Sequence, residues 1–269
     1  MTASLDLDAY LDRIRWGGAV RQDLDTLSGL LRAHMRSIPF ENLDVLLGRP
    51  IRLDLQGIQD KLVRASRGGY CFEHATLFAA ALDALGFKPA RHTGRVVVFV
   101  PRTAAPRTHM FLTVAVSEGT FVVDPGFGSL APRVPVPLAE GQQARIGDET
   151  HWMVRDGRYW VLHAQVGADP IQAWASTAEE EFPVDFEMGN HYTSTHPTSP
   201  FVNRIMMRAL TDEGRVTVAN RDVTFWHGTT PEHVQLADRA ALRALLVDRF
   251  GFDLPEVDRL RVSSIPEWA

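Results

Sequence analysis

The only cysteine of the chain, Cys71, lies in the segment RGGYCFEH, directly after a pair of glycines. Apolar residues follow it at steps of three and four, which predicts a buried helix that begins near Cys71 and is capped by Gly86. The first turn of a helix presents unpaired N–H groups and the positive end of the helix dipole, and both favour a thiolate over a thiol. Cys71 is therefore a candidate nucleophile, with Glu73 and His74 as possible partners. A free cysteine often serves only as buried packing, so this alternative stays open.

A thiol nucleophile needs a base that takes its proton and a third group that orients this base. His109 in THMFLTVAV and Asp124 in FVVDPGFG lie in two segments that are predicted to form a hairpin with its turn near Glu118 and Gly119. With that turn Asp124 faces Thr113, on the same side of the sheet as His109 but about 13 Å from it along the strand. A bulge, a bend or a longer loop must close this distance if the two residues act together. Each also has a simpler explanation, as a histidine at a sheet margin and an Asp-Pro-Gly turn.

The composition is that of an ordinary globular protein. Of its 269 residues, 45% are hydrophobic and 23% are charged, with a formal net charge of −5 and a pI near 6.1. This acidic balance, without a dense run of Lys or Arg, argues against nucleic acid and anionic membranes as partners. The first residues lack the features of a signal peptide, and no apolar stretch reaches the ~18 residues of a membrane span. Since one cysteine cannot form an internal disulfide, the sequence predicts a cytoplasmic protein.

Metal binding has little support in the sequence. The ten histidines are scattered, the patterns CxxC and HExxH do not occur, and His191 and His196 lack a third ligand nearby in the sequence. The acidic run of residues 179–181 is most simply a solvated surface. We therefore expect neither a bound metal nor a tightly bound cofactor.

The hydrophobic periodicity changes along the chain. Up to about residue 87 it is helical, with apolar stripes over 7–14, 24–31 and 58–63. The runs RVVVFV, HMFLTVAV, TFVVD and HWMVRDGRYWVLHA then predict a mainly antiparallel sheet, the last run being a hairpin about Asp156 and Gly157. A loop is predicted for NHYTSTHPTSP, followed by the strand-like runs RIMMRAL and RVTVAN. The last predicted element is an amphipathic helix from Asp238 to Phe250.

Five segments together resemble the arylamine N-acetyltransferase family. They are PFENLDVLLGRP (39–50), RGGYCFEH (67–74), THMFLTV (108–114), VDPGFG (123–128) and YTSTHPTSPF (192–201), in the family's order over most of the chain. The resemblance implies an α+β fold with a cysteine-protease/transglutaminase-like core. Its parts would be an N-terminal helical bundle over 1–87, a central antiparallel β-barrel over 88–190 and a C-terminal α/β lid over 191–269.

The same resemblance implies roles for individual residues. Cys71, His109 and Asp124 match the family's triad, in which the thiolate attacks acetyl-coenzyme A, the imidazole shares or accepts the proton and the carboxylate holds the imidazolium. An arylamine, hydrazine or hydrazide then removes the acetyl group in a second half-reaction, which is ping-pong catalysis. Acetyl-coenzyme A is in this view a co-substrate.

Substrate contacts are implied as well. The positions similar to the family's acceptor pocket are Phe40, Thr108, Phe127 and Phe201. Aromatic walls of this kind suit a flat aryl acceptor through stacking and apolar burial. The candidates for contacts to the coenzyme are Gly126 and Gly128, in the loop after Asp124.

This chain departs from its relatives at Ala75, Pro125 and Ser129, where they usually have asparagine, valine and glycine. These changes bear on the loop beside the coenzyme, and therefore on donor affinity and acceptor range. Glu41 and Arg67 lie in two of the matching segments. We expect them to form a buried ion pair that fixes the loop before the nucleophile.

Other functions use the same residue order. An amide synthase would take an acyl chain from a carrier protein and join it to an aryl amine, and a cysteine hydrolase or transglutaminase-like enzyme would use the same triad on other acceptors. A non-catalytic scaffold, with Cys71 as packing, is the remaining alternative. The sequence leaves open the natural acceptor, the preferred acyl length and the oligomeric state.

Overall fold

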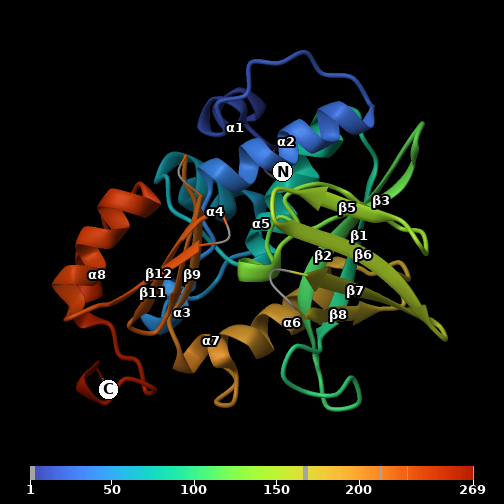
Figure 1. Cartoon of the computed structure of the whole chain (residues 1–269). Coiled ribbons are helices and arrows are strands. Elements are labelled where there is room, and N and C mark those ends of the chain that lie inside the picture. Colours follow the sequence, from blue (N-terminus) through green and yellow to red (C-terminus); the bar gives the residue numbers. More distant parts are fainter. Residues whose placement is uncertain (1–3, 166–168, 213, 229, 269) are drawn as a thin grey trace.

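The structure is a computed structural model that describes residues 4–165, 169–212, 214–228 and 230–268. Helices dominate its N-terminal third, strands its middle, and a small sheet with a helix its C-terminal part (Figure 1). The helical segments are α1 (Leu7–Arg13), α2 (Leu24–Ser37), α3 (Leu43–Leu46), α4 (Leu55–Ile58), η1 (Gln59–Arg64), α5 (Cys71–Ala84), η2 (Gly128–Leu130), α6 (Pro183–Thr195), α7 (Pro200–Asn203), α8 (Arg239–Leu245), η3 (Leu246–Phe250), η4 (Pro255–Arg259) and η5 (Pro266–Trp268).

The strands are β1 (Pro89–Val96), β2 (Arg107–Val116), β3 (Gly119–Val123), β4 (Val136–Pro137), β5 (Gln143–Ile146), β6 (Glu149–Asp156), β7 (Tyr159–Gln165), β8 (Pro170–Ser176), β9 (Met206–Leu210), β10 (Arg215–Ala219), β11 (Asp222–His227) and β12 (Thr230–Gln235). Among the described residues the first eight form one sheet, in the order β4-β3-β2-β1-β8-β7-β6-β5, and all neighbours are antiparallel. Because β4 also lies against β5 and β6, the sheet is nearly closed into a barrel. The antiparallel barrel expected from the sequence is confirmed at this level, and the protease-like core stays a prediction.

Helix α5 carries the cysteine and lies at the centre of the main hydrophobic cluster. Its N-cap is Tyr70, so Cys71 is the first helical residue, and the chain leaves the helix through Gly86 with φ of 87°. Both features were predicted. Glu73 caps the start of the helix, because its Oε2 accepts a hydrogen bond from the Tyr70 backbone N–H over 3.1 Å.

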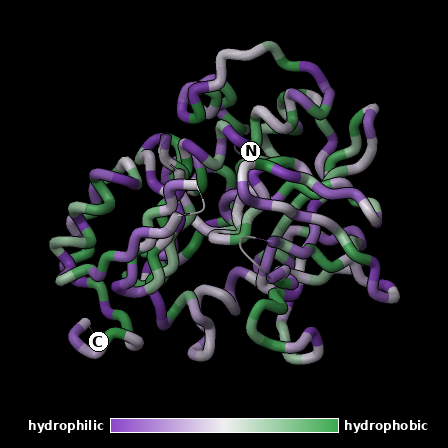
Figure 2. The backbone as a smooth tube through the Cα atoms, viewed as in Figure 1, coloured by the Kyte–Doolittle hydropathy of each residue, from purple (hydrophilic) through white to green (hydrophobic). Residues whose placement is uncertain are grey.

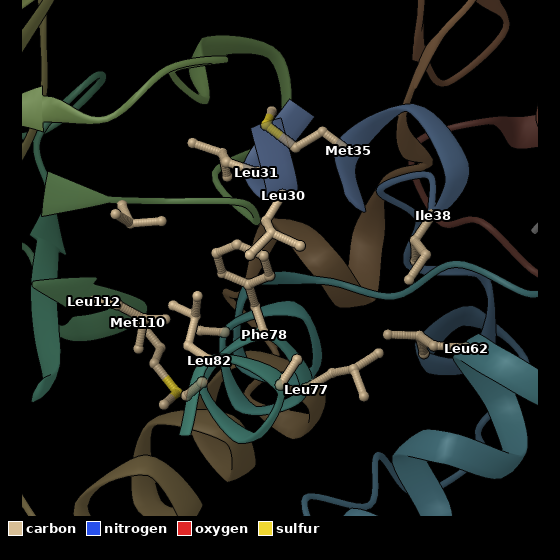
Figure 3. Packing of buried hydrophobic residues seen from close by; sticks show 14 of the residues in the cluster. Leu30, Leu31, Met35, Ile38, Leu62, Leu77, Phe78, Leu82, Met110 and Leu112 are labelled. Atoms are coloured by element: carbon tan, nitrogen blue, oxygen red, sulfur yellow. The ribbon is translucent and has the colours of Figure 1, made fainter. Parts of the chain in front are cut away.

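The cluster around α5 joins the helices to the barrel. Figure 3 shows Phe78 and Leu82 of α5 close to Leu30 of α2, with Met110 and Leu112 of β2 beside them. This packing fixes where the start of α5 meets the start of β2. The helix that holds the thiol and the strand that holds His109 therefore have a defined relative position.

The register of the β2–β3 hairpin differs from the prediction. Val116 pairs with Gly119, so the turn consists of the two residues between them and lies earlier than expected. Continuing the register one residue beyond β3 places Asp124 opposite Phe111. Phe111 is two residues from His109, whereas the expected partner of Asp124, Thr113, is four residues from His109. Side chains two residues apart share a face of the sheet, so the predicted gap was wrong and this hairpin needs no bulge to close it.

The C-terminal part forms a second sheet in the order β12-β11-β10-β9. Asp238 caps α8 by accepting a hydrogen bond from the Ala241 N–H over 2.8 Å, and Gly251 ends the helical segment with φ of 77°. Hydrophilic and hydrophobic residues mix along α8, as an amphipathic helix requires (Figure 2). The predicted strands over RIMMRAL and RVTVAN and this helix are confirmed.

Two local predictions are wrong, and a third is confirmed only in part. The strand expected over RVVVFV ends at Val96, and Phe99 is 92% exposed in the loop after it. Residues 190–195, expected in a loop, form the end of α6, where the Thr193 hydroxyl donates back to the Gly189 carbonyl over 2.8 Å and satisfies the helix locally. In the acidic run, Glu179 and Glu180 are exposed as expected, but the Glu181 side chain is only 8% exposed and accepts from Thr93 over 2.6 Å.

The division into three domains stays a prediction. Helix α6 crosses the expected boundary between residues 190 and 191 and packs against β2. In the ranges that the structure covers, no helix combines the length and the hydrophobicity needed to cross a membrane.

Candidate active site

The thiol of Cys71 lies at the junction of the helices and the barrel. The residue is 3% exposed, and its Sγ is 3.7 Å from the carbonyl oxygen of Thr108 at the start of β2. Its place as the first residue of α5 puts the sulfur beside the unpaired N–H groups of the helix start.

His109 connects this thiol to Asp124. The ring donates from Nε2 to Oδ2 of Asp124 over 2.7 Å, and both side chains are buried. Nδ1 is then the ring nitrogen left to face Cys71, whose interaction with His109 contributes to the pKa of the imidazole. Burial lowers the pKa of His109, but the charge and hydrogen bond of Asp124 and the contact with Cys71 together raise the pKa to about 9. At neutral pH His109 is therefore an imidazolium between two acidic groups.

The carboxylate of Asp124 has two further donors. The indole Nε1 of Trp174 in β8 donates to Oδ2 over 2.9 Å, and the Gly126 N–H donates to Oδ1 over 3.4 Å. Hydrogen bonds to an ionised carboxylate hold it in one orientation. Asp124 is thus arranged to orient His109.

Aromatic rings lie beside the imidazole and beside Tyr70, the residue before the thiol. The edge of Phe127 contacts His109, with ring centroids 4.7 Å apart at 66°. Phe201 contacts both Phe40 and Tyr70 edge to face, with centroids 6.2 and 5.4 Å away. These phenylalanines are only partly buried and pack against the cluster that contains Cys71.

The loop after Asp124 approaches α5 very closely at Gly126. A Cβ on Gly126 would lie 2.6 Å from Cα of Cys71 and 3.1 Å from Cβ of His74, so only glycine fits. Gly128 has φ of 69° and faces Phe40, whose ring would lie 3.3 Å from an added Cβ. The structure thus gives both glycines a packing role, and their role toward a coenzyme stays a prediction.

The expected ion pair between Glu41 and Arg67 is confirmed. Arg67 donates from Nε and Nη2 to Oε1 of Glu41 over 3.0 and 2.6 Å, and both residues are buried. The pair is part of a larger network that includes Asp44, Lys61 and Glu73. Nζ of Lys61 lies 2.9 Å from Oδ2 of Asp44 and 2.8 Å from Oε1 of Glu73. The network holds the loop that precedes Cys71.

His74 belongs to a second buried chain and not to the triad. Its Nε2 donates to the Pro39 carbonyl over 3.2 Å, so its Nδ1 accepts from Nε2 of His34 over 2.9 Å. The Tyr10 hydroxyl then donates to Nδ1 of His34 over 3.0 Å. Burial lowers the pKa of His74 to about 4, so both rings of the chain are neutral near pH 7.

The site contains one residue that the sequence did not reveal. Trp174 lies in β8, 50 residues after Asp124, and no short motif connects the two. The available signal was general, since a tryptophan in a buried strand needs an acceptor for its N–H. All nine residues proposed from the sequence are close to the thiol, to His109 or to the rings beside them.

A metal site is not formed by the described ranges, in which no three His, Cys, Asp or Glu side chains gather in a suitable group. The arrangement instead has the elements of nucleophilic catalysis, which are a thiol at a helix start, an imidazole beside it and a carboxylate that orients the imidazole. Such a group can accept an acyl chain on sulfur and pass it to a second nucleophile.

Comparison with known proteins points to the same chemistry. A sequence profile described as N-acetyltransferase matches residues 23–259. An arylamine N-acetyltransferase of Mycolicibacterium smegmatis is 38% identical over 94% of each chain, and one of Escherichia coli is 36% identical over 93% of this chain and 90% of its own. The solved structure of Mycobacterium marinum arylamine N-acetyltransferase in complex with CoA superposes with a TM-score of 0.89, at 36% identity over 94% of each chain.

Proposed function

Because the chain belongs to the arylamine N-acetyltransferase family, we propose that it transfers an acetyl group from acetyl-coenzyme A to an aromatic amine, hydrazine or hydrazide. The observation that carries the proposal is the position of His109, which is hydrogen-bonded to Asp124 through Nε2 and interacts with Cys71 closely enough to raise the pKa of the imidazole. A cysteine that served only as packing would not need an imidazolium and a buried carboxylate aligned beside it.

In the first half-reaction the Cys71 thiolate attacks the carbonyl carbon of the thioester. A bond forms between Sγ and the acetyl carbon, and the bond between that carbon and the coenzyme sulfur breaks. The coenzyme leaves as a thiol after taking the proton of the His109 imidazolium. Acetyl-Cys71 and a neutral imidazole remain.

In the second half-reaction the nitrogen of the acceptor attacks the acetyl carbon. Neutral His109 takes a proton from this nitrogen, and the carbon–sulfur bond breaks to regenerate the Cys71 thiolate and the imidazolium. Asp124 stabilises the imidazolium that is present before the first half-reaction and is formed again in the second. One residue thus acts as acid in the first step and base in the second.

Phe127, Phe40 and Phe201 are the proposed walls for the aryl group of the acceptor. Their partly buried rings pack against the cluster that contains Cys71, and Phe127 contacts His109, which supports this role because a flat ring gains from stacking and apolar burial. Thr108 contributes its carbonyl oxygen at 3.7 Å from the sulfur and sits at the same edge.

The test is to measure coenzyme A release and acetylated product together, with and without an arylamine. The proposal predicts that release continues only while amine is present, that product equals coenzyme released, and that Cys71→Ser does neither. Release at the same rate without amine would identify a hydrolase. Acyl transfer from a carrier protein but not from acetyl-coenzyme A would identify an amide synthase.

A further inference from the structure

The turn over residues 128–131, directly after the loop that carries Asp124, is held by an arginine from the C-terminal sheet. Nη1 of Arg208 in β9 donates to the carbonyl oxygen of Gly128 over 2.7 Å and to that of Ala131 over 3.1 Å. Two carbonyl groups that are one turn apart therefore share one guanidinium. Arg208 is 80 positions from Gly128 and 77 positions from Ala131 in the chain, so the contact is a tertiary one.

A second buried side chain holds the middle of the same turn. Nε2 of His151 in β6 donates to the carbonyl oxygen of Leu130 over 3.1 Å, and burial lowers the pKa of His151. The turn is thus fixed from the barrel on one side and from the C-terminal sheet on the other.

Stability alone does not explain a cation at position 208. Arg208 is 4% exposed, and burial lowers its pKa to about 10 despite the opposing charge of Glu149. Oε1 of Glu149 is 3.7 Å from Nη2 of Arg208, but Nη1 of Arg215 is closer to the same oxygen, at 2.8 Å. Nε of Arg133 lies 3.0 Å from the other oxygen, Oε2. Within the described ranges, Nε and Nη2 of Arg208 make no hydrogen bond. A buried charge with incomplete pairing is destabilising, so its retention calls for another reason.

The space beside Arg208 does not suit a substrate. A cavity of about 10 Å³ touches Arg208, Phe40, Pro125 and Gly128, and it is no larger than one water molecule needs. The guanidinium therefore acts on its protein neighbours.

Those neighbours lead directly to the reacting groups. The backbone of Arg208 pairs with that of Phe40 through two hydrogen bonds of 2.9 Å, and Gly128 packs against the Phe40 ring. Phe127 immediately precedes the held turn, and its ring edge contacts His109. A shift of the turn would move Phe127 away from the imidazole.

We propose that Arg208 is a positioning residue for acyl transfer, which holds the turn over 128–131 and thereby the ring of Phe127 against His109. The proposal rests on the proposed function of the triad. It makes the C-terminal sheet part of the machinery that shapes the acceptor site, although that sheet contributes no member of the triad.

The experiment compares Arg208→Met with Arg215→Met. Both remove a cation near Glu149, but only Arg208 binds the turn. The rate of Cys71 acetylation and the kcat/KM for an arylamine are measured separately, and the NMR signals of the His109 ring report the position of Phe127 without any turnover. Arg208→Lys is included because it keeps the charge but not the planar fork.

We expect Arg208→Met to lower acceptor kcat/KM by about tenfold to a hundredfold, the scale of a small displacement near reacting atoms, and to shift the His109 ring signals. Arg215→Met should leave the acceptor kcat/KM and the His109 ring signals near those of the wild type. Arg208→Lys should lie between the wild type and Arg208→Met in both measurements. Equal losses in Arg208→Met and Arg215→Met, or an unshifted His109 signal in Arg208→Met, would overturn the inference. If Arg208→Met does not fold, Arg208→Lys decides the inference. Wild-type acceptor kcat/KM and His109 signals in Arg208→Lys would overturn the inference, and an intermediate loss of kcat/KM with shifted His109 signals would support it. Absence of acetyl-Cys71 in the wild type would instead count against the proposed function, which the NMR arm does not require.

Discussion

The indole nitrogen of Trp174 and the imidazole of His109 donate to the same oxygen of Asp124, over 2.9 and 2.7 Å. Trp174 lies in β8 and Asp124 follows β3, with two strands between them in the sheet order. Their side chains meet only because the barrel curves around its interior. Trp174 also stacks on Phe111 with ring centroids 4.1 Å apart, which fixes the indole independently of the hydrogen bond.

Replacing Trp174 by phenylalanine should therefore separate packing from hydrogen bonding. Trp174→Phe keeps an aromatic ring against Phe111 but removes the donor to Asp124. We expect kcat/KM to fall roughly tenfold or more, since a hydrogen bond to a charged group contributes about 1.5–3 kcal/mol. The measurement is the steady-state rate with a fixed arylamine. Trp152→Phe, a change at a ring that stacks on His163 elsewhere in the barrel, is the matched control and should keep wild-type kinetics.

Gly126→Ala should perturb the catalytic loop. The new Cβ would lie 2.6 Å from the Cα of Cys71, a distance that the backbone of α5 cannot tolerate without a shift. We expect a loss of about 1–3 kcal/mol in the free energy of unfolding, as for other overpacked sites, together with a large loss of activity. Urea unfolding and acetylation rates measure the two effects. Gly17→Ala has open space around its Cβ and should change neither, and a fully active Gly126→Ala would contradict the close approach of loop and helix.

Glu41→Gln should leave the buried Arg67 guanidinium without its main counter-charge. Removing one partner of a buried ion pair costs about 3–5 kcal/mol in stability, and Asp44 at 3.4 Å offsets only part of that loss. The exposed pair of Arg52 and Asp54 is a matched control, because surface ion pairs contribute about 0–1 kcal/mol. If Glu41→Gln and Asp54→Asn lower the urea midpoint equally, the network does not support the loop before Cys71.

The neutral pair of His34 and His74 predicts a loss of stability in acid. The pKa of His74 is lowered by burial from 6.5 to about 4 in the folded chain. Between these two pH values the unfolded chain binds a proton that the folded chain does not. The stability that the neutral His74 ring contributes is therefore fully present above pH 6.5 and is lost as the pH falls toward 4.

Urea unfolding measured across that pH range checks the sign. His74→Gln removes the titrating ring, so its stability should be lower near neutral pH and should fall less steeply in acid than that of the wild type. An identical pH dependence in both proteins would show that His74 does not titrate in this window.

Local patterns in the sequence predicted the parts of the fold that local interactions determine. The start of the helix at Cys71, the glycine at its end and the cap at Asp238 follow from residues within a few positions of each other, and all are present. The loop predicted for residues 190–195 failed because its hydroxyl side chains bond back to the helix and its asparagine is buried, which composition alone does not show.

The spatial relations in the site could be predicted only in part. Strand alternation predicted that His109 and Asp124 share a face of the sheet. Their separation along the strand depended on the position of the turn, and the turn expected from the sequence doubled this separation from two residues to four. Trp174 and Arg208 reach the site from strands far along the chain. Their contribution depends on barrel closure and on the seating of the C-terminal sheet, which are tertiary events.

The central claim is that Cys71 carries the acetyl group between donor and acceptor. The most direct measurement is the mass of the protein after brief exposure to acetyl-coenzyme A, with the modified peptide identified, followed by addition of an arylamine. The account predicts one acetyl group on the peptide containing Cys71, its transfer to the amine when the amine is added, and an unchanged mass for Cys71→Ser. An unmodified Cys71 in an enzyme that nevertheless acetylates the amine, or an acetyl-Cys71 that the amine does not discharge, would contradict it.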